Sequence, residues 1–311
     1  MTSSPAPPPV RRLTLADLPA CLALAADRGW TREEHKWRLL LTAGQGYGID
    51  APADDPPPGS PGPGRHPRGG LIGAFVLTSY GPPAGSPDRT AYTCVSMVLV
   101  AGRHARRGLG RRLMRHALAE SGSAAVFLTA TDFGRPLYEE LGFVPVGTTT
   151  MLTGRFARDG ADGRTAGVPV RDATAADLPA VLALDAPVFG ADRTHLLARL
   201  PSFADHFVVA AAASGTGITG FAAAWPNEGT TVLGPVVAED ETTARALIAE
   251  LASRTDGPVR YDADTRHRGL TDWLRAHGLT GDTTNTLMVH GAPDIPGDIG
   301  RRFAPYSVAL G

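Results

Sequence analysis

A glycine-rich turn with basic flanks follows an apolar, β-prone run within residues 97–118. The run ends near Val100, Gly108 and Gly110 come next, and a basic helix is expected over 109–121. Successive backbone N–H groups in such a turn point into one concavity, and the positive end of the helix dipole lies behind them. Both glycines can adopt positive φ, which lets a phosphate approach the backbone. The pattern therefore predicts a site for a phosphate-bearing ligand.

The charge around this turn is strongly positive. The arginines concerned are Arg103, Arg106, Arg107, Arg111 and Arg112. They suit a ligand with more phosphate than a pyrophosphate alone, although a glycine loop before a surface helix with solvated arginines gives the same pattern. A P-loop is excluded because Lys36 is the only lysine of the chain. A dinucleotide fingerprint is excluded because Leu113 stands where the third glycine would be.

A tyrosine precedes a Gly-Phe pair in the second motif, LYEELGF, at residues 137–143. It follows an apolar run at 124–130, and Tyr138 is expected on a short helix that ends at Gly142. A phenol with a pKa near 10 can give a proton to a forming anion and recover it from solvent. Half-buried packing with the hydroxyl in water is the alternative role for this side chain.

In this order and spacing, the two motifs resemble those of the GNAT acetyltransferase superfamily, over Met97 to Phe143. The resemblance implies transfer of an acetyl group from acetyl-CoA (coenzyme A) to a primary amine by direct attack. It implies that the turn holds the pyrophosphate, that the preceding strand offers an N–H to the thioester carbonyl, and that Tyr138 is the catalytic acid. The implied cofactor-binding residues are Met97, Val98, Leu99, Val100, Ala105, Arg106, Arg107, Gly108, Leu109, Gly110, Arg111 and Thr131.

One position departs from the family pattern. Members usually carry arginine or glutamine where this chain has Ala105. The backbone cradle tolerates that change, but one side-chain contact is lost, and Arg106 or Arg107 could replace it.

The sequence leaves open which group removes the proton from the amine. Many members carry a glutamate in the strand expected at 91–100, and this strand has none. The candidates are Glu33, Glu34, His35, Asp132 and a water held by Ser96. Glu33 and Glu34 also fit a capping and solvated pair, His35 fits a surface residue, and Asp132 fits a cap of the Tyr138 helix. A water relay, or selection of a substrate that is already deprotonated, is equally compatible with the sequence.

Two tryptophans lie seven residues apart on the helix that commonly forms one wall of the acceptor pocket in this superfamily. Core packing is expected for Trp37, whereas Trp30 is open to either role. Trp30, His35 and Ser96 are therefore the candidates for substrate contact, and no metal is needed.

An internal repeat predicts the architecture. Val10–Leu24 and Val170–Leu184 are identical at eleven of fifteen positions, and each reads as a short strand, a Thr-x-x-Asp helix start and an apolar helix. We therefore expect an α/β (α+β) GNAT-like fold with two tandem domains, at 1–156 and 168–311. Each domain would be a twisted mixed sheet flanked by helices, and 157–169 would link them.

Coarse elements follow from periodicity and turn signals. In the first copy these are helices at 15–27 and 31–44, a capping box of Thr31 with Glu34, strands at 46–51, 70–80, 91–100, 124–130 and 143–153, and a mobile hairpin tip at 52–70. In the second copy they are strands at 206–213, 217–226, 230–237, 257–263 and 283–290, with helices at 240–254 and 266–277.

The second copy lacks both chemical motifs. Glu239, Asp240 and Glu241 stand at its counterpart of the glycine turn and would repel a pyrophosphate. Leu274 stands where the tyrosine would be. We expect a degenerate GNAT-like domain, which could shape the substrate pocket, mediate a homodimer or bury surface.

Composition narrows the function classes. The chain has 311 residues, 43% of them hydrophobic and 20% charged, with a net charge of −1. Near-neutrality argues against a nucleic-acid partner. Cys21 and Cys94 form no CxxC pattern, so neither a disulfide scaffold nor a zinc site is indicated. Because no long apolar run or hydrophobic leader is present, we expect a cytoplasmic protein with no membrane partner.

Three functions are compatible with these motifs. The first is an N-acetyltransferase acting on a small-molecule amine. The second is a protein acetyltransferase acting on lysine or an N-terminus. The third is a non-catalytic acyl-CoA-binding sensor, which would keep the glycine turn and would not need Tyr138.

Overall fold

The computed structural model describes residues 8–52, 70–82, 85, 91–122, 124–157, 167–212 and 217–311. The chain divides into two compact units, Met1–Thr78 with Val95–Gly122, and Ser79–Cys94 with Ser123–Gly311. Most of the hairpin tip predicted at 52–70 and of the linker predicted at 157–169 lies outside the described residues.

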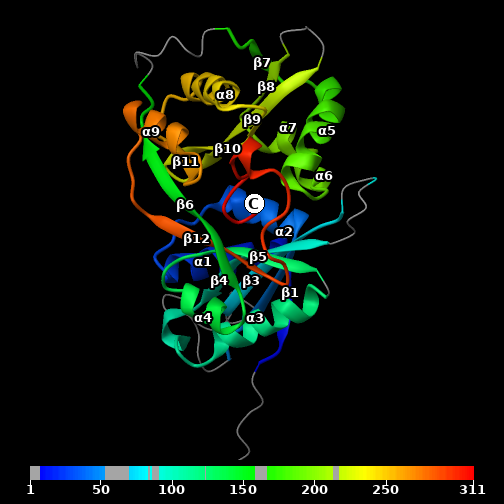
Figure 1. Cartoon of the computed structure of the whole chain (residues 1–311). Coiled ribbons are helices and arrows are strands. Elements are labelled where there is room, and N and C mark those ends of the chain that lie inside the picture. Colours follow the sequence, from blue (N-terminus) through cyan, green and yellow to red (C-terminus); the bar gives the residue numbers. More distant parts are fainter. Residues whose placement is uncertain are drawn as a thin grey trace, which may run out of the picture. The chain divides into compact units, whose positions relative to one another are not determined.

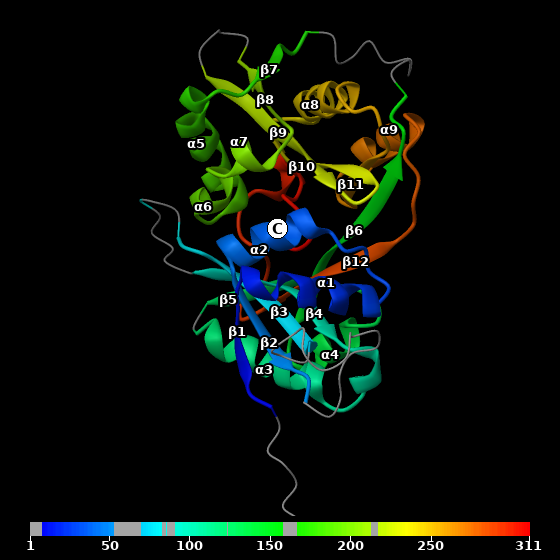
Figure 2. The ribbon, with the colours of Figure 1, turned by 180° about the vertical axis from the view of Figure 1, so that it is seen from behind.

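The first unit contains an antiparallel sheet. Strand β1 (Val10–Leu13) pairs with β2 (Gln45–Asp50), and β2 pairs with β3 (Leu71–Tyr80). Helices α1 (Leu18–Asp27) and α2 (Glu34–Ala43) lie side by side, both in blue in Figure 2. Helix α3 (Leu109–Glu120) follows strand β4 (Tyr92–Val100). The buried side chains of this unit include Leu18, Cys21, Leu24, Trp37, Leu40, Ile49, Phe75, Leu99, Leu113 and Met114.

Both copies of the sequence repeat start their first helix in the same way. A threonine and an aspartate form a capping box around a 3₁₀ turn, and the α-helix begins directly after it. An arginine from the preceding strand then bonds to the capping aspartate, at 2.8 Å in the first copy and 2.7 Å in the second. The residues are Arg11, Thr14 and Asp17, and Arg171, Thr174 and Asp177. The predicted helix starts are confirmed, with α1 itself beginning at Leu18.

The capping box predicted at Thr31 and Glu34 is wrong. Helix α2 begins at Glu34, and its N-cap is Glu33, which has a left-handed backbone (φ 43°) and no side-chain cap bond. The physical reason is that both carboxylates are engaged elsewhere. Glu33 forms a buried ion pair with Lys36, and Glu34 accepts a 2.7 Å bond from Arg38.

The second unit contains the remaining elements. The first copy contributes β5 (Ala125–Ala130), α4 (Arg135–Glu140) and β6 (Val144–Gly154). The second copy contributes β7 (Val170–Asp172), α5 (Leu178–Phe189), α6 (Thr194–Leu197), α7 (Leu200–Phe203), β8 (His206–Ala211), β9 (Ile218–Asn227), β10 (Thr230–Ala238), α8 (Glu241–Ser253), β11 (Val259–Asp264), α9 (Arg268–Ala276), β12 (Thr284–His290) and β13 (Arg302–Ala304). The mixed α/β class with helices flanking a sheet is confirmed, whereas α6, α7 and β13 were not predicted.

The two copies exchange strands in this unit. The strand order is β5-β12-β6-β11-β10-β9-β8-β7, so β12 of the second copy lies between β5 and β6 of the first (Figure 1). Met288 of β12 faces Leu128 of β5, and Asp262 of β11 faces Met151 of β6, in antiparallel registers. Both neighbours of β6 therefore come from the second copy.

A buried ion pair lies beside the end of the chain. Arg193 donates two bonds, of 2.8 Å and 2.6 Å, to the carboxylate of Asp185, and a third of 3.0 Å to the carbonyl oxygen of Gly311. Both side chains of the pair are at most 2% exposed. The guanidinium also lies 4.3 Å from the ring centre of Phe189. A charge pair this deep is tolerated because its polar atoms are mutually satisfied.

Candidate active site

The glycine turn starts helix α3 in the first unit. Gly108 is the N-cap, with φ at 78°, and Leu109 is the first helical residue. A Cβ at Gly108 would meet no atom within 4 Å, so the backbone angle and not crowding favours glycine here. The positive φ expected for Gly110 is wrong, because this residue is the second of the helix.

The backbone of this turn carries unused donors. Arg112 makes the first helical bond, to the carbonyl oxygen of Gly108 at 3.0 Å. The N–H groups of Gly108, Leu109 and Gly110 bond to no residue that the structure describes. Three successive free donors at the positive end of a twelve-residue helix form a concavity that suits an anion.

The five arginines around the turn divide into three that are exposed and two, Arg103 and Arg112, that are half-buried. Arg106, Arg107 and Arg111 are exposed, so their guanidinium groups can reach phosphates outside the turn. Arg112 is half-buried, and its guanidinium donates a 2.5 Å bond to the carbonyl oxygen of Pro8. Ala105, the departure from the family pattern, is half-buried.

Strand β4 is irregular directly before the turn. Met97 has a left-handed backbone (φ 52°), which is strained for a non-glycine residue in a strand. The neighbouring Ser96 is 7% exposed, and its Oγ has no partner among the described residues. Leu99 is buried, while Val98 and Val100 are half-buried. Strain and an unsatisfied hydroxyl at one point of a strand are features of functional sites.

Trp30, His35 and Trp37 differ in how far their side chains are exposed to solvent. Trp37 is fully buried, which confirms core packing. Trp30 is 38% exposed and is available for contact with a ligand. His35 is half-buried on α2.

The candidate bases are mostly engaged. Glu33 is 6% exposed and paired with Lys36, so the solvated role expected for this carboxylate is wrong. The burial of Lys36, the only lysine, requires a counter-charge and accounts for the difference. Glu34 is exposed and bonded to Arg38, and Asp132 is exposed.

Tyr138 lies in the second unit, on α4. Its side chain is 8% exposed, and burial raises the pKa of the phenol to about 12. The ring meets Phe143 edge-on, with centroids 6.0 Å apart, and a Cβ at Gly134 would lie only 3.0 Å from it. The hydroxyl bonds to none of the described residues. The cap expected from Asp132 is wrong, because Gly134 is the N-cap of α4 and the helix has no side-chain cap bond. The Oγ1 of Thr131 accepts the Gly134 N–H in the turn before the helix.

In the second copy, a side chain of the protein occupies the N-terminus of the corresponding helix, α8. The carboxylate of Asp240 caps α8 and accepts the Thr243 N–H at 2.7 Å. A negative side chain therefore stands where the first copy offers free donors. Leu274, at the position of the tyrosine, is fully buried.

The second copy also fills the space beside its central strand. Strands β10 and β11 pair in parallel over only two residues, Thr231 and Val232 of β10. Further along, β10 pairs with β13 instead, where Val236 faces Ala304. Tyr261 of β11 donates a 2.8 Å bond to the carbonyl oxygen of Phe303. The chain itself thus occupies the gap between the two strands.

The described residues offer neither a cluster of metal ligands nor a membrane-spanning helix. They contain no group of three or more His, Cys, Asp or Glu side chains placed to hold a metal. Within the same residues, no helix combines the length and the apolar character needed to cross a membrane.

Comparisons with known proteins agree with the fold and the motifs. Two family models, both described as "Acetyltransferase (GNAT) domain", match residues 74–154 and 181–304. The Bacillus subtilis (strain 168) protein named "Uncharacterized N-acetyltransferase YitH" is 28% identical over 298 residues, which cover 93% of this chain and 94% of the relative.

Solved structures share the fold along the whole chain. A putative acetyltransferase from Pyrococcus horikoshii superposes with a TM-score of 0.75 at 16% identity, covering 100% of this chain and 98% of its own. A tandem GNAT protein from the clavulanic acid biosynthesis pathway reaches 0.58 at 16% identity, covering 92% and 99%. The chain therefore belongs to the GNAT acetyltransferase family. It carries two GNAT domains in tandem.

Proposed function

We propose that this protein transfers an acetyl group from acetyl-CoA to the primary amine of a small molecule. The observation that carries the proposal is the set of free N–H donors at Gly108, Leu109 and Gly110. These donors and the exposed arginines around them fit the phosphates of coenzyme A. The family membership supports acyl transfer as the reaction class.

In this reaction each of the following groups has one role. Acetyl-CoA supplies the acyl group as an activated thioester. The irregular backbone at Ser96–Val98 offers an N–H to the negative charge that develops on the thioester oxygen. The new N–C bond forms as the C–S bond breaks, and Tyr138 gives its proton to the sulfur. The acylated nitrogen releases one proton to solvent, and the Tyr138 phenolate recovers one proton from solvent, so the step balances. The amine must arrive deprotonated, because only the free amine is a nucleophile.

The raised pKa of Tyr138 is compatible with this proton transfer. An ordinary phenol and an ordinary thiol have pKa values of about 10 and about 8.5. Burial raises the pKa of Tyr138 to about 12, and burial also raises the pKa of the Cys94 thiol. Burial of the coenzyme A sulfur would raise the pKa of its thiol as well. The difference between the pKa values of the phenol and the thiol would therefore stay small.

The first test is calorimetric titration of acetyl-CoA into the full-length protein. We expect one site per chain, and we expect Gly108→Val to weaken binding at least tenfold, because valine is strained at φ 78°. Gly229→Val is the matched control, since Gly229 has φ 72° and equally open surroundings in the second copy. It should bind as the wild type does.

Three results would contradict the proposal. Absence of binding would remove the acyl-CoA site altogether. Two sites per chain would show that the second copy also binds the cofactor. Equal effects of Gly108→Val and Gly229→Val would show that backbone strain, and not the turn, controls binding. One site should be followed by a screen of amines in which release of the free thiol reports transfer.

A further inference from the structure

Arg302 is a buried cation without a counter-ion. The residue lies on β13 and is 7% exposed. Among the described residues, its guanidinium forms no hydrogen bond and no ion pair, and its one side-chain contact of note is with the ring of Phe189, 5.5 Å away. A buried charge is costly unless it is paired, so this arrangement needs an explanation.

The neighbouring carboxylates, Asp185 and Asp264, compensate Arg302 only in part, because each is bonded to another arginine. Arg193 is already bonded through two nitrogens to Asp185. Arg266 is bonded through two nitrogens, at 2.9 Å and 2.7 Å, to Asp264. The Arg193–Asp185 and Arg266–Asp264 pairs each have a net charge of zero, so the positive charge of Arg302 has no bonded partner among the described residues. Burial, and then repulsion by Arg193 and Arg266, lower the pKa of Arg302 to about 10, against a smaller opposing attraction by Asp264 and Asp185.

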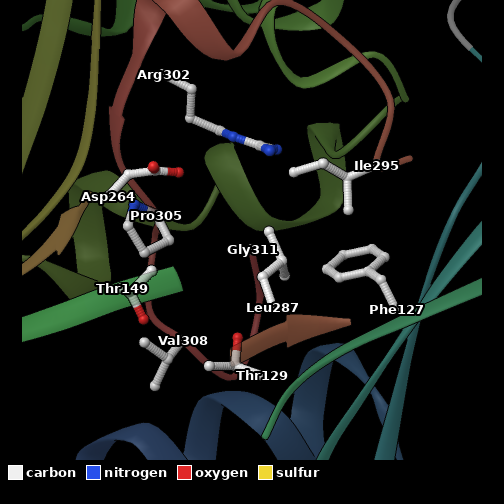
Figure 3. A pocket seen from close by; sticks show the side chains of 10 residues that line it. All are labelled: Phe127, Thr129, Thr149, Asp264, Leu287, Ile295, Arg302, Pro305, Val308 and Gly311. Atoms are coloured by element: carbon white, nitrogen blue, oxygen red, sulfur yellow. The ribbon is translucent and has the colours of Figure 1, made fainter. Parts of the chain in front are cut away.

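Arg302 lines a pocket in the second unit. The other lining residues are Phe127, Thr129, Thr149, Asp264, Leu287, Ile295, Pro305, Val308 and Gly311. Figure 3 shows the guanidinium extending over this pocket, between Asp264 and Ile295. Thr149 provides a second unused polar group, because it is 7% exposed and its Oγ1 has no partner among the described residues.

The pocket is small. Its empty space is about 440 Å³ including solvent at the mouth, and about 40 Å³ of this admits the centre of a water molecule. One water needs roughly 10–15 Å³ by the latter measure. The interior thus has room for a few waters, or for one small polar head group on a carbon chain.

We infer that this pocket binds the carboxylate of a small organic acid, with Arg302 as its counter-ion. A planar carboxylate matches the guanidinium in charge and shape, and Thr149 can donate a further bond. Phe127, Leu287 and Val308 offer apolar contact to the carbon chain. A phosphate dianion is disfavoured because it is larger and carries more charge than Arg302 balances.

The same inference names the substrate class, and this step rests on the proposed function. Phe127 and Thr129 lie on β5, the strand that leads to the helix of Tyr138. On this inference the acceptor amine also carries a carboxylate, as an amino acid does, and Arg302 holds that carboxylate.

The binding test needs no catalysis. Melting temperatures of the full chain are measured with acetate, propionate or glycine, against chloride at equal ionic strength. We expect the carboxylates to stabilise the wild type and to have no effect on Arg302→Met. Arg301→Met is the matched control, because Arg301 is half-exposed and paired with Asp298 at 2.8 Å. It should respond as the wild type does.

The ligand-free proteins give an independent readout. Arg302→Met should melt at a higher temperature than the wild type, because it removes a buried unpaired charge. A purely structural role for Arg302 would instead give a lower melting temperature. That fall, or equal carboxylate responses in wild type and Arg302→Met, would overturn the site.

The acceptor step is tested with matched pairs, alanine against ethylamine and phenylalanine against phenethylamine. We expect the ratio of kcat/KM between acid and amine to fall at least tenfold in Arg302→Met. An unchanged ratio would overturn the acceptor assignment. If no amine is acylated while carboxylates still stabilise the protein through Arg302, the proposed transferase function fails and the carboxylate site stands.

Discussion

Tyr138→Phe is expected to lower kcat by about 10²-fold or more while the affinity for acetyl-CoA stays unchanged. The ring packs against Phe143 and Gly134, and phenylalanine preserves those contacts. Only the hydroxyl is lost, and it bonds to none of the described residues. The variant therefore removes a proton donor with little structural change, and general acids contribute roughly 10²–10⁴-fold to rates. Thiol release and calorimetry on the same preparation measure the two quantities.

The pH dependence adds a second expectation for this variant. With its pKa raised to about 12, Tyr138 remains protonated at every pH up to 10. Deprotonation of Tyr138 should therefore cause no fall in kcat at alkaline pH up to 10. The plots of kcat against pH for wild type and variant should have the same shape and differ only in the value of kcat. Tyr47→Phe serves as the control, because this hydroxyl bonds to Glu120 at 2.8 Å in the first unit. A normal kcat in Tyr138→Phe would show that this hydroxyl is not the catalytic acid.

Asp185→Ala should lower the free energy of unfolding by about 3–5 kcal/mol, the loss typical of breaking a buried ion pair. The substitution leaves the Arg193 guanidinium buried with only the Gly311 carbonyl oxygen as a bonded partner. Urea unfolding measures the loss. Asp298→Ala is the comparison, because its pair with Arg301 is partly exposed, and the pair should be worth at most about 1 kcal/mol. Equal losses in the two variants would show that burial of the pair is unimportant.

Local signals were reliable guides to the first and second copies alike. The Thr-x-x-Asp helix starts at Thr14 and Thr174 are capping boxes, because the bonds that make them lie within four residues. The alternation and length of apolar runs likewise predicted strands such as β9 and helices such as α8 within two residues of their ends. The family motifs were visible because both lie in one continuous segment of 47 residues, from Met97 to Phe143.

Features that depend on distant partners could not be predicted. The start of α2 was missed although Glu33 and Lys36 are only three residues apart, because the burial of their ion pair depends on the surrounding fold and no local pattern reports burial. The exchange of β6 and β12 depends on pairings more than 100 residues apart, such as Asn285 with Thr149. Arg302 reads in the sequence as one of two adjacent arginines. Only the fold distinguishes it from Arg301, which is paired and partly solvated.

The exchanged strands also govern how the polypeptide can be made. When a ribosome has completed β6, at Gly154, neither neighbour of that strand has been synthesised, and the antiparallel neighbour of β5 follows only at 284–290. Open strand edges can pair with other chains, and long-range pairing slows folding. The strand edges of the nascent first copy therefore stay unpaired until nearly the entire second copy has been synthesised. Neither half contains all the strands of its own sheet, so we expect that a chain cut between the two copies would give two fragments with open strand edges.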